Sequence, residues 1–170
     1  MALAFCSIQI EPGVDHRLMN DFKKAVTIFE GVVADHSGFD GGVSATVILD
    51  AERSLKLTFP AELKAFYTQF GGGGVGGIEI AGLVYPEGNV VGVTMEGREG
   101  GLHEKLLVLE STGDDGFFVL DLRSDDEQPV RVWAPGAFYS VDDLDPVAES
   151  FGGFLLMRAE TAKEVVSYEP

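Results

Sequence analysis

Apolar residues spaced three or four apart predict two amphipathic helices in the first third of the chain. The first helix spans residues 15–33, and its apolar face consists of Leu18, Phe22, Val26, Phe29 and Val33. The second begins near Ile48, where Ala51 and Leu55 share a face and charged residues occupy the other side. Before both helices, alternating apolar residues over positions 3–10 predict a β-strand.

A third helix follows Pro60, because a fixed φ and a missing N–H suit the first turn of a helix. Its apolar stripe is largely aromatic and comprises Phe59, Leu63, Phe66, Tyr67 and Phe70. Gly71 can end this helix in a left-handed conformation. Helices this short owe their stability to packing, so the helices on either side of Pro60 must cover a larger surface.

The second half of the chain is rich in strand-like runs. These are residues 77–85, 105–109, 117–122 and 130–133. Polar turns at residues 113–116 and 124–128 predict hairpins between the last three runs. Residues 90–98 fit either a strand, by their valine content, or a short helix. Residues 147–157 predict a helix, and a short helical or strand segment through residues 165–166 follows it.

The glycines at residues 71–77 formally spell the dinucleotide fingerprint G-x-G-x-x-G. Phosphate binding needs a strand before the glycines and a helix N-terminus after them. Here a predicted helix precedes the glycines and a predicted strand follows them. A flexible helix-to-strand turn is therefore the better interpretation.

The sequence lacks recognisable catalytic and metal-binding motifs. His16, His36 and His103 stand in no metal-ligand spacing, and no nucleophile elbow occurs. Adjacent carboxylates such as Asp114 and Asp115 lie in polar turns, where a solvated loop is the simpler explanation. The sequence therefore predicts a protein with no enzymatic activity, no metal and no cofactor.

Composition favours a single cytoplasmic domain. With 170 residues, 45 % of them hydrophobic, the chain can bury a sizeable core. Its single cysteine, Cys6, excludes a disulfide framework. The apolar N-terminus is too short to span a bilayer and has no basic residue before Arg17, so it does not fit a signal peptide.

The formal charge of −16, from 12 basic and 28 acidic residues, limits the possible partners. Nucleic acids and anionic membranes attract Lys and Arg, so neither is expected to bind this chain. A basic protein is the favoured partner class, because an acidic field accelerates its encounter. The alternative is that the acidity serves solubility alone.

Half of this charge lies between residues 111 and 150, where ten acidic residues are opposed only by Arg123 and Arg131. Aromatic side chains in the same region can anchor an interface. The predicted partner-binding residues are Asp114, Asp115, Asp125, Asp126, Glu127, Trp133, Phe138 and Tyr139. The alternative is that Trp133 belongs to the core and the acidic residues form solvated turns.

An ordered set of short motifs runs through the chain from about residue 44 to residue 158. The set comprises Ala51-Glu52-x-x-Leu55-x-Leu57-x-Phe59-Pro60, Leu63-Lys64-x-Phe66-Tyr67, the glycine cluster, Thr94-x-x-x-Arg98, Gly101-Leu102, a strand at residues 106–109, Leu120-Asp121, Pro129-Val130, Trp133 and Ala148-Glu149-Ser150-Phe151-x-x-Phe154-Leu155. In this order the motifs resemble the SUKH superfamily, which includes a fungal cell-wall-synthesis regulator and many bacterial immunity proteins. Each motif is loose on its own, and the ordered set carries the resemblance.

The resemblance implies an α+β fold with a twisted, mainly antiparallel sheet of about five or six strands and helices packed on one side. It favours a short helix for residues 90–98. Residues 44–170 would form the SUKH-like domain, and residues 1–43 an N-terminal extension, a strand and an amphipathic helix, packed on it.

Bacterial SUKH domains look like immunity proteins, which implies that this chain binds a toxin and occludes its active site. The toxin would be a basic protein, often a nuclease, and the chain a monomer or weak homodimer. The alternative is a regulatory or scaffold protein without a toxin partner, as the fungal relatives suggest.

Overall fold

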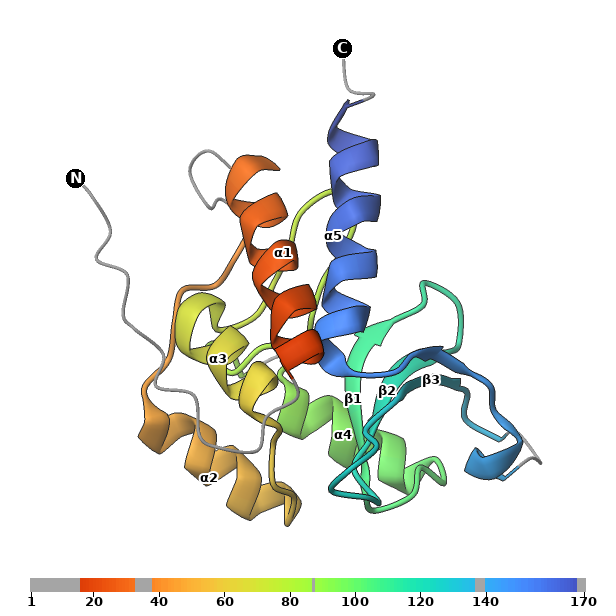
Figure 1. Cartoon of the computed structure of the whole chain (residues 1–170). Coiled ribbons are helices and arrows are strands. Elements are labelled where there is room, and N and C mark those ends of the chain that lie inside the picture. Colours follow the sequence, from red (N-terminus) through yellow and green to blue (C-terminus); the bar gives the residue numbers. More distant parts are fainter. Residues whose placement is uncertain (1–15, 33–37, 87, 137–139, 168–170) are drawn as a thin grey trace.

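The computed structural model describes residues 16–32, 38–86, 88–136 and 140–167 (Figure 1). The described elements are, in chain order, α1 (His16–Val32), α2 (Ala45–Leu55), α3 (Ala61–Phe70), α4 (Val90–Glu99), β1 (Leu106–Ser111), β2 (Phe117–Asp121), β3 (Val130–Trp133), the 3₁₀ turn η1 (Val141–Asp143), β4 (Pro146–Ala148) and α5 (Phe151–Ser167). This is an α+β fold, as the sequence predicts. The strand expected at residues 3–10 lies outside the described residues.

The described strands form one antiparallel sheet in the order β1-β2-β3-β4. Four strands are fewer than the five or six expected, and the run at residues 77–85 accounts for part of the difference. In that run only Ile80 forms a bridge, with Gly73. Glycines with positive φ, such as Gly76 and Gly77, keep the backbone turning there, so a ladder cannot extend.

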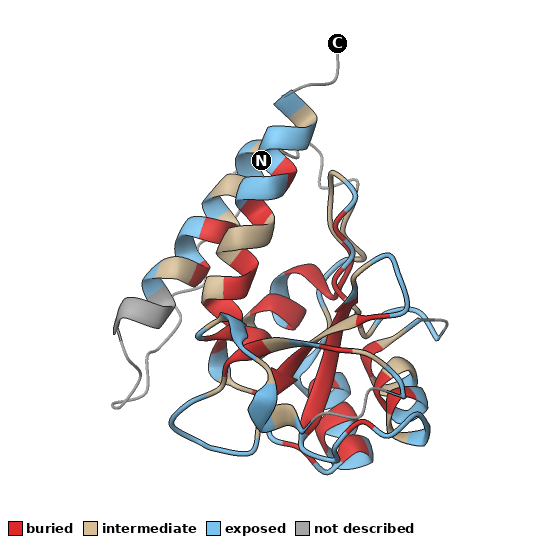
Figure 2. Cartoon of the chain, turned by 90° about the vertical axis from the view of Figure 1, so that its right-hand side faces the viewer, coloured by how far each residue is buried: buried red, intermediate tan, exposed pale blue. Residues whose placement is uncertain are grey.

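Both faces of the sheet are covered by helices, not one face as expected. Leu107 and Leu109 of β1 belong to the larger core, together with buried residues of α1, α2, α3 and α5. Leu106 and Val108 point to a smaller core, against which Val93 of α4 packs. Four consecutive apolar residues in one strand are the sequence signature of burial on both faces. Buried residues accordingly concentrate along the strands in Figure 2.

The two longest helices, α1 and α5, lie against each other (Figure 1). Phe22 and Phe29 of α1 are buried in the larger core, as the periodicity of residues 15–33 predicts, and Ala25 is buried beside them. The prediction of a helix over residues 147–157 is wrong at its start and its end. Residues 146–148 pair with β3 as an edge strand, and α5 begins at Phe151 and continues through residues 165–166 to Ser167.

A buried carboxylate fixes the hinge between α2 and α3. The Glu52 side chain accepts a hydrogen bond from the Phe59 backbone N–H (2.6 Å) and lies 2.8 Å from the Lys64 ammonium. Lys56 ends α2 in the left-handed conformation, with φ of 56°. Pro60 stands at the N-cap of α3, one position before the first turn. Gly71 ends α3 with φ of 73°, as predicted.

A second buried carboxylate joins α3 to α5. Glu62 accepts a hydrogen bond from the Gly152 N–H (2.9 Å), and its other oxygen has no hydrogen-bond partner among the described residues. A Cβ on residue 152 would lie 2.6 Å from that oxygen, so a larger residue there would have to displace the Glu62 carboxylate. Burial raises the pKa of Glu62, the Gly152 hydrogen bond lowers it, and the negative charge of Asp21 raises it; the net change is upward.

We expect Phe66→Ala to destabilise the domain by about 3–5 kcal/mol, because a fully buried aromatic side chain leaves a cavity. Phe66 contacts the rings of Phe39, Phe70, Tyr67 and Phe151 at centroid distances between 5.4 and 6.4 Å. Urea denaturation measures the loss, and the exposed Val47→Ala on α2 is the control. A loss below about 1 kcal/mol would contradict the packing of α3 in the core.

We expect Glu62→Gln to stabilise the domain at neutral pH. A pKa raised in the folded state means that wild-type stability falls as pH rises above the ordinary value of 4.5. The amide carries no charge, so the advantage of the variant should be largest at neutral pH and vanish below pH 4.5. Denaturation curves across this pH range test the expectation, with the exposed Glu160→Gln as control. A pH-independent difference would contradict it.

Candidate functional site

The acidic residues predicted to bind a partner lie at two opposite ends of the sheet. Asp114 and Asp115 stand in the turn between β1 and β2, whereas residues 125–127 stand between β2 and β3. Because β2 runs from one turn to the other, about 15 Å of strand separates them. Figure 1 shows the two turns pointing away from each other. One flat partner surface cannot touch both turns at close range.

Among the predicted aromatic anchors, Trp133 is not available on this surface. Trp133 is only 6 % exposed and stacks on Phe117 with ring centroids 6.1 Å apart. It belongs to the smaller core, which favours the alternative that it is a core residue. Phe138 and Tyr139 lie outside the described residues.

The two acidic residues of the β1–β2 turn have different roles. The Asp114 carboxylate accepts hydrogen bonds from the Thr112 hydroxyl and from the Gly116 N–H, the latter at 3.2 Å. These hydrogen bonds, led by that from Thr112, lower the pKa of Asp114 and fix the turn. Asp115 is exposed and accepts no hydrogen bond from the described residues, so it can interact with a partner.

Both arginines of the acidic region are bound within the fold. Arg123 contacts the Asp121 carboxylate through two nitrogens, at 2.9 and 2.8 Å, and a third lies 2.9 Å from Asp142. Arg131 lies 3.4 Å from Asp121 and donates to the Leu144 carbonyl. Burial alone would raise the pKa of Asp121, but the hydrogen bonds and charges of the arginines outweigh it and hold the pKa low. The other carboxylates of the turns are therefore left without a cation from this pair.

We expect Asp121→Asn to cost about 2–3 kcal/mol, less than for a fully buried pair, because the Arg123 side chain remains partly exposed. A depressed pKa means that this stabilisation is present above the ordinary carboxyl value of 3.8 and is lost as pH falls through the lower folded-state pKa. Wild type and variant should therefore converge below pH 3.8. Thermal unfolding over a pH series checks this, and a constant difference would contradict it.

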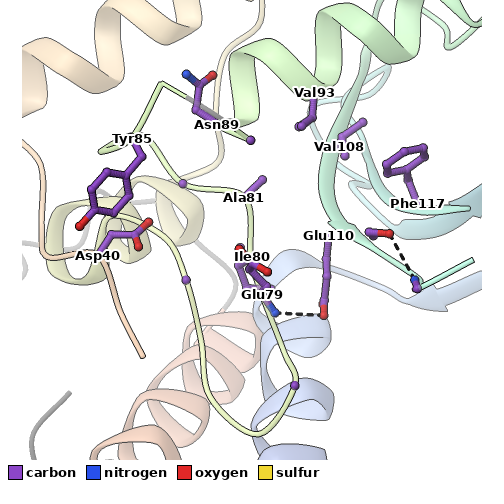
Figure 3. A pocket seen from close by; sticks show the side chains of 16 residues that line it. Asp40, Glu79, Ile80, Ala81, Tyr85, Asn89, Val93, Val108, Glu110 and Phe117 are labelled. Atoms are coloured by element: carbon purple, nitrogen blue, oxygen red, sulfur yellow. Dashed lines mark hydrogen bonds between the residues drawn. The ribbon is translucent and has the colours of Figure 1, made fainter. Parts of the chain in front are cut away.

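A groove of about 380 Å³ lies beside β1, at the edge of the sheet (Figure 3). Its walls are built by Asp40, by the segment between α3 and α4, by Val93 of α4, by β1 and the turn after it, and by Phe117 of β2. Its charged and aromatic side chains are Asp40, Glu79, Glu110, Tyr85 and Phe117. No Lys or Arg is among the described residues that line it. The turn carrying Asp115 begins at Gly113, which also lines the groove, so the groove and this turn form one acidic surface.

The carboxylates of the groove are not equivalent. Glu110 is buried and pairs with Arg158 through two hydrogen bonds of 2.8 and 2.5 Å, while one oxygen also accepts from the Glu79 N–H (3.3 Å). Asp40 is half-buried, and among the described residues no donor is bonded to its carboxylate. Burial, and then the charge of Glu79, raise the pKa of Asp40.

The edge of the sheet next to this groove is already satisfied. The Val108 N–H donates to the Thr94 hydroxyl (3.1 Å), and the Leu109 carbonyl accepts from the Ala81 N–H (2.7 Å). A β-bulge follows Val108 in the pairing with β2. These hydrogen bonds and the β-bulge disfavour the pairing of another strand with β1. Recognition at this groove therefore depends on side chains.

Sequence reasoning missed Asp40, Glu79 and Tyr85, because the groove joins segments that are far apart in the sequence. Glu110 carried a signal, since a charged residue directly after four apolar strand residues must find a buried partner or end the strand. No group of three or more metal-ligating side chains gathers among the described residues. No helix in the described part of the chain is long and apolar enough to cross a membrane.

A model of the family described as SMI1-KNR4 cell-wall, SUKH_5, matches residues 28–160. The chain belongs to this SUKH family. The match begins at residue 28, within α1, whereas the sequence motifs begin near residue 44. It ends at residue 160, within α5.

Several SUKH motif residues serve the architecture of the domain. Thr94 and Arg98 lie one turn apart on α4: the first binds the edge of β1, and the second donates to the carbonyls of Leu55 and Glu104 (3.1 and 2.6 Å). The Tyr67 hydroxyl donates to the Ala81 carbonyl (3.1 Å) and so fixes the wall of the groove. These motifs therefore build the SUKH fold and position the groove.

Proposed function

We propose that this SUKH domain is a non-enzymatic immunity protein that binds a cognate bacterial toxin and occludes the toxin's active site. The partner would be a basic, nuclease-type domain, met in the cytoplasm by a monomer or weak homodimer. Family membership supports a protein-binding role of this kind. We further propose that residues 1–43 form an extension packed on the domain at 44–170, and the packing of α1 on α5 supports this contact.

The observation that carries the proposal is the uncompensated negative charge of the sheet's turns. Arg123 and Arg131 are held by Asp121 and neighbouring groups, so among the exposed acids of the region they contact only Asp142 within the described residues. Exposed residues in this region include Asp115, Asp125, Asp126, Glu127, Asp143, Asp145 and Glu149. A nuclease binds the phosphates of its substrate with Lys and Arg. The basic substrate-binding surface of such a toxin would be attracted to these acidic turns.

Between the two acidic ends, the end that includes the groove is the better contact surface. It combines a concave region with the exposed Asp115 and the exposed ring of Tyr85, features that binding sites favour. The turn at residues 125–127 would then act at longer range, on the encounter rate more than on the complex.

A regulatory or scaffold role is the second candidate, and the cell-wall description of the family favours it. In that case the acidic surface would bind a protein of the host cell. The gene neighbourhood separates the two functions, because an immunity gene lies beside the gene of its toxin. Co-expression with the neighbouring gene would rescue growth only for the immunity protein.

We expect neutralisation of Asp114, Asp115, Asp125, Asp126 and Glu127 to Asn or Gln to slow association with the toxin about ten-fold or more at low salt. Wild-type association should weaken steeply as ionic strength rises and the Debye length falls below about 10 Å, whereas the variant should respond little. Stopped-flow measurements over a salt series give both slopes.

Two matched pairs of substitutions sharpen this test. Asp114→Asn with Asp115→Asn removes two charges beside the groove, whereas Glu160→Gln with Glu164→Gln removes two exposed charges from α5. The first pair should slow association more than the second. Equal salt slopes for wild type and the variant with five substitutions would rule out electrostatic steering. The acidity would then serve solubility alone.

A further inference from the structure

We propose that the groove beside β1 binds an arginine side chain that the protein partner presents, with Asp40 and Glu79 as the acceptors of its guanidinium. The inference rests on the proposed protein-binding function and deepens it. It assigns the partner's chemistry to one concave site rather than to the acidic turns in general. The shape of the groove, its charges and its aromatic rim support this assignment.

The lining of the groove has two parts that match the two parts of an arginine side chain. Val93, Val108 and Phe117 form an apolar part at one end, and Asp40 lies toward the other end (Figure 3). An arginine buries its aliphatic stem against apolar surface and keeps its charged head at polar groups. The volume of about 380 Å³ leaves room for one such side chain.

The acceptors lie where a cation is missing. Asp40 and Glu79 both line the groove, and no basic side chain among the described residues lines it with them. Two neighbouring carboxylates without a cation repel each other. A guanidinium bound between them would relieve this repulsion and donate hydrogen bonds to both carboxylates.

The third carboxylate of the groove shows which cation suits it. Glu110 already holds the guanidinium of Arg158 through two parallel hydrogen bonds of 2.8 and 2.5 Å. It is therefore occupied from within the fold, and Asp40 and Glu79 remain for a partner. The planar, five-donor guanidinium can reach both, whereas an ammonium acts as a point charge.

Tyr85 adds a contact that favours a guanidinium over an ammonium. Its side chain is 59 % exposed and lies at the same end of the groove as Asp40 (Figure 3). Guanidinium groups stack on aromatic faces more often than ammonium groups do. The exposed Tyr85 ring can therefore stack on the guanidinium that the carboxylates bind.

The test measures the binding of three probes to the full chain, using NMR shifts of the backbone amides as the readout. They are a blocked Gly-Arg-Gly peptide, the same peptide with citrulline, which is neutral and of nearly equal shape, and methylguanidinium as a free cation. The arginine peptide should shift the amides of residues 79–82 and 110–113. Citrulline should not, and methylguanidinium should bind about ten-fold more weakly, because it lacks the stem and the backbone.

Variants locate the site. Glu79→Gln replaces an exposed side chain and should weaken the arginine peptide about ten-fold without unfolding the protein. Asp40→Asn should do the same. Asp126→Asn removes an exposed charge from the far end of the sheet and should leave binding unchanged.

Three results would overturn the inference: equal shifts from citrulline, shifts that concentrate at residues 125–127, or no shifts at all. Equal affinity for methylguanidinium would assign the groove to a small cation instead of a protein side chain. Because no toxin is used, the peptide result is independent of the proposed function. Toxin binding that survives Glu79→Gln would leave the function intact and refute the groove alone.

Discussion

The burial of β1 on both faces is the constraint on which the rest of the domain depends. Its four consecutive apolar residues cannot lie at the surface on either side, so each face needs a cover. The larger core draws α1, α2, α3 and α5 to one face, and α4 with Leu102 and Trp133 closes the other. The strand also carries Glu110 at its end, so the element that organises the core supplies a wall of the groove as well.

Helical periodicity predicted the three N-terminal helices well, because their apolar faces are clean and Gly71 marks an end. The family resemblance, and not valine content, identified α4 correctly. The sheet was harder to predict. Residues 77–85 look like a strand by composition, yet their glycines and the positions of their hydrogen-bond partners allow one bridge only. Residues 146–148 pair with β3 in a way that no local pattern reveals.

The candidate site was harder still to predict from the sequence. Counting charges located the acidic turns, but it could not show that β2 separates them or that Arg123 and Arg131 are already bound. Asp114 is an acid by composition and a turn-forming residue by its hydrogen bonds. The groove is invisible in the sequence, because Asp40, Glu79 and Glu110 meet only after α3 has turned the chain back onto β1.

The edges of the sheet limit how a partner can be recognised. On one side Thr94 and Ala81 occupy two backbone groups of β1, the Val108 N–H and the Leu109 carbonyl. On the other, β4 is three residues long and begins with Pro146, which has no N–H to offer. These features disfavour the addition of an extended peptide to the described edges of the sheet. Affinity must come from side chains, so the choice of partner can change through surface substitutions that leave the folding of the sheet untouched.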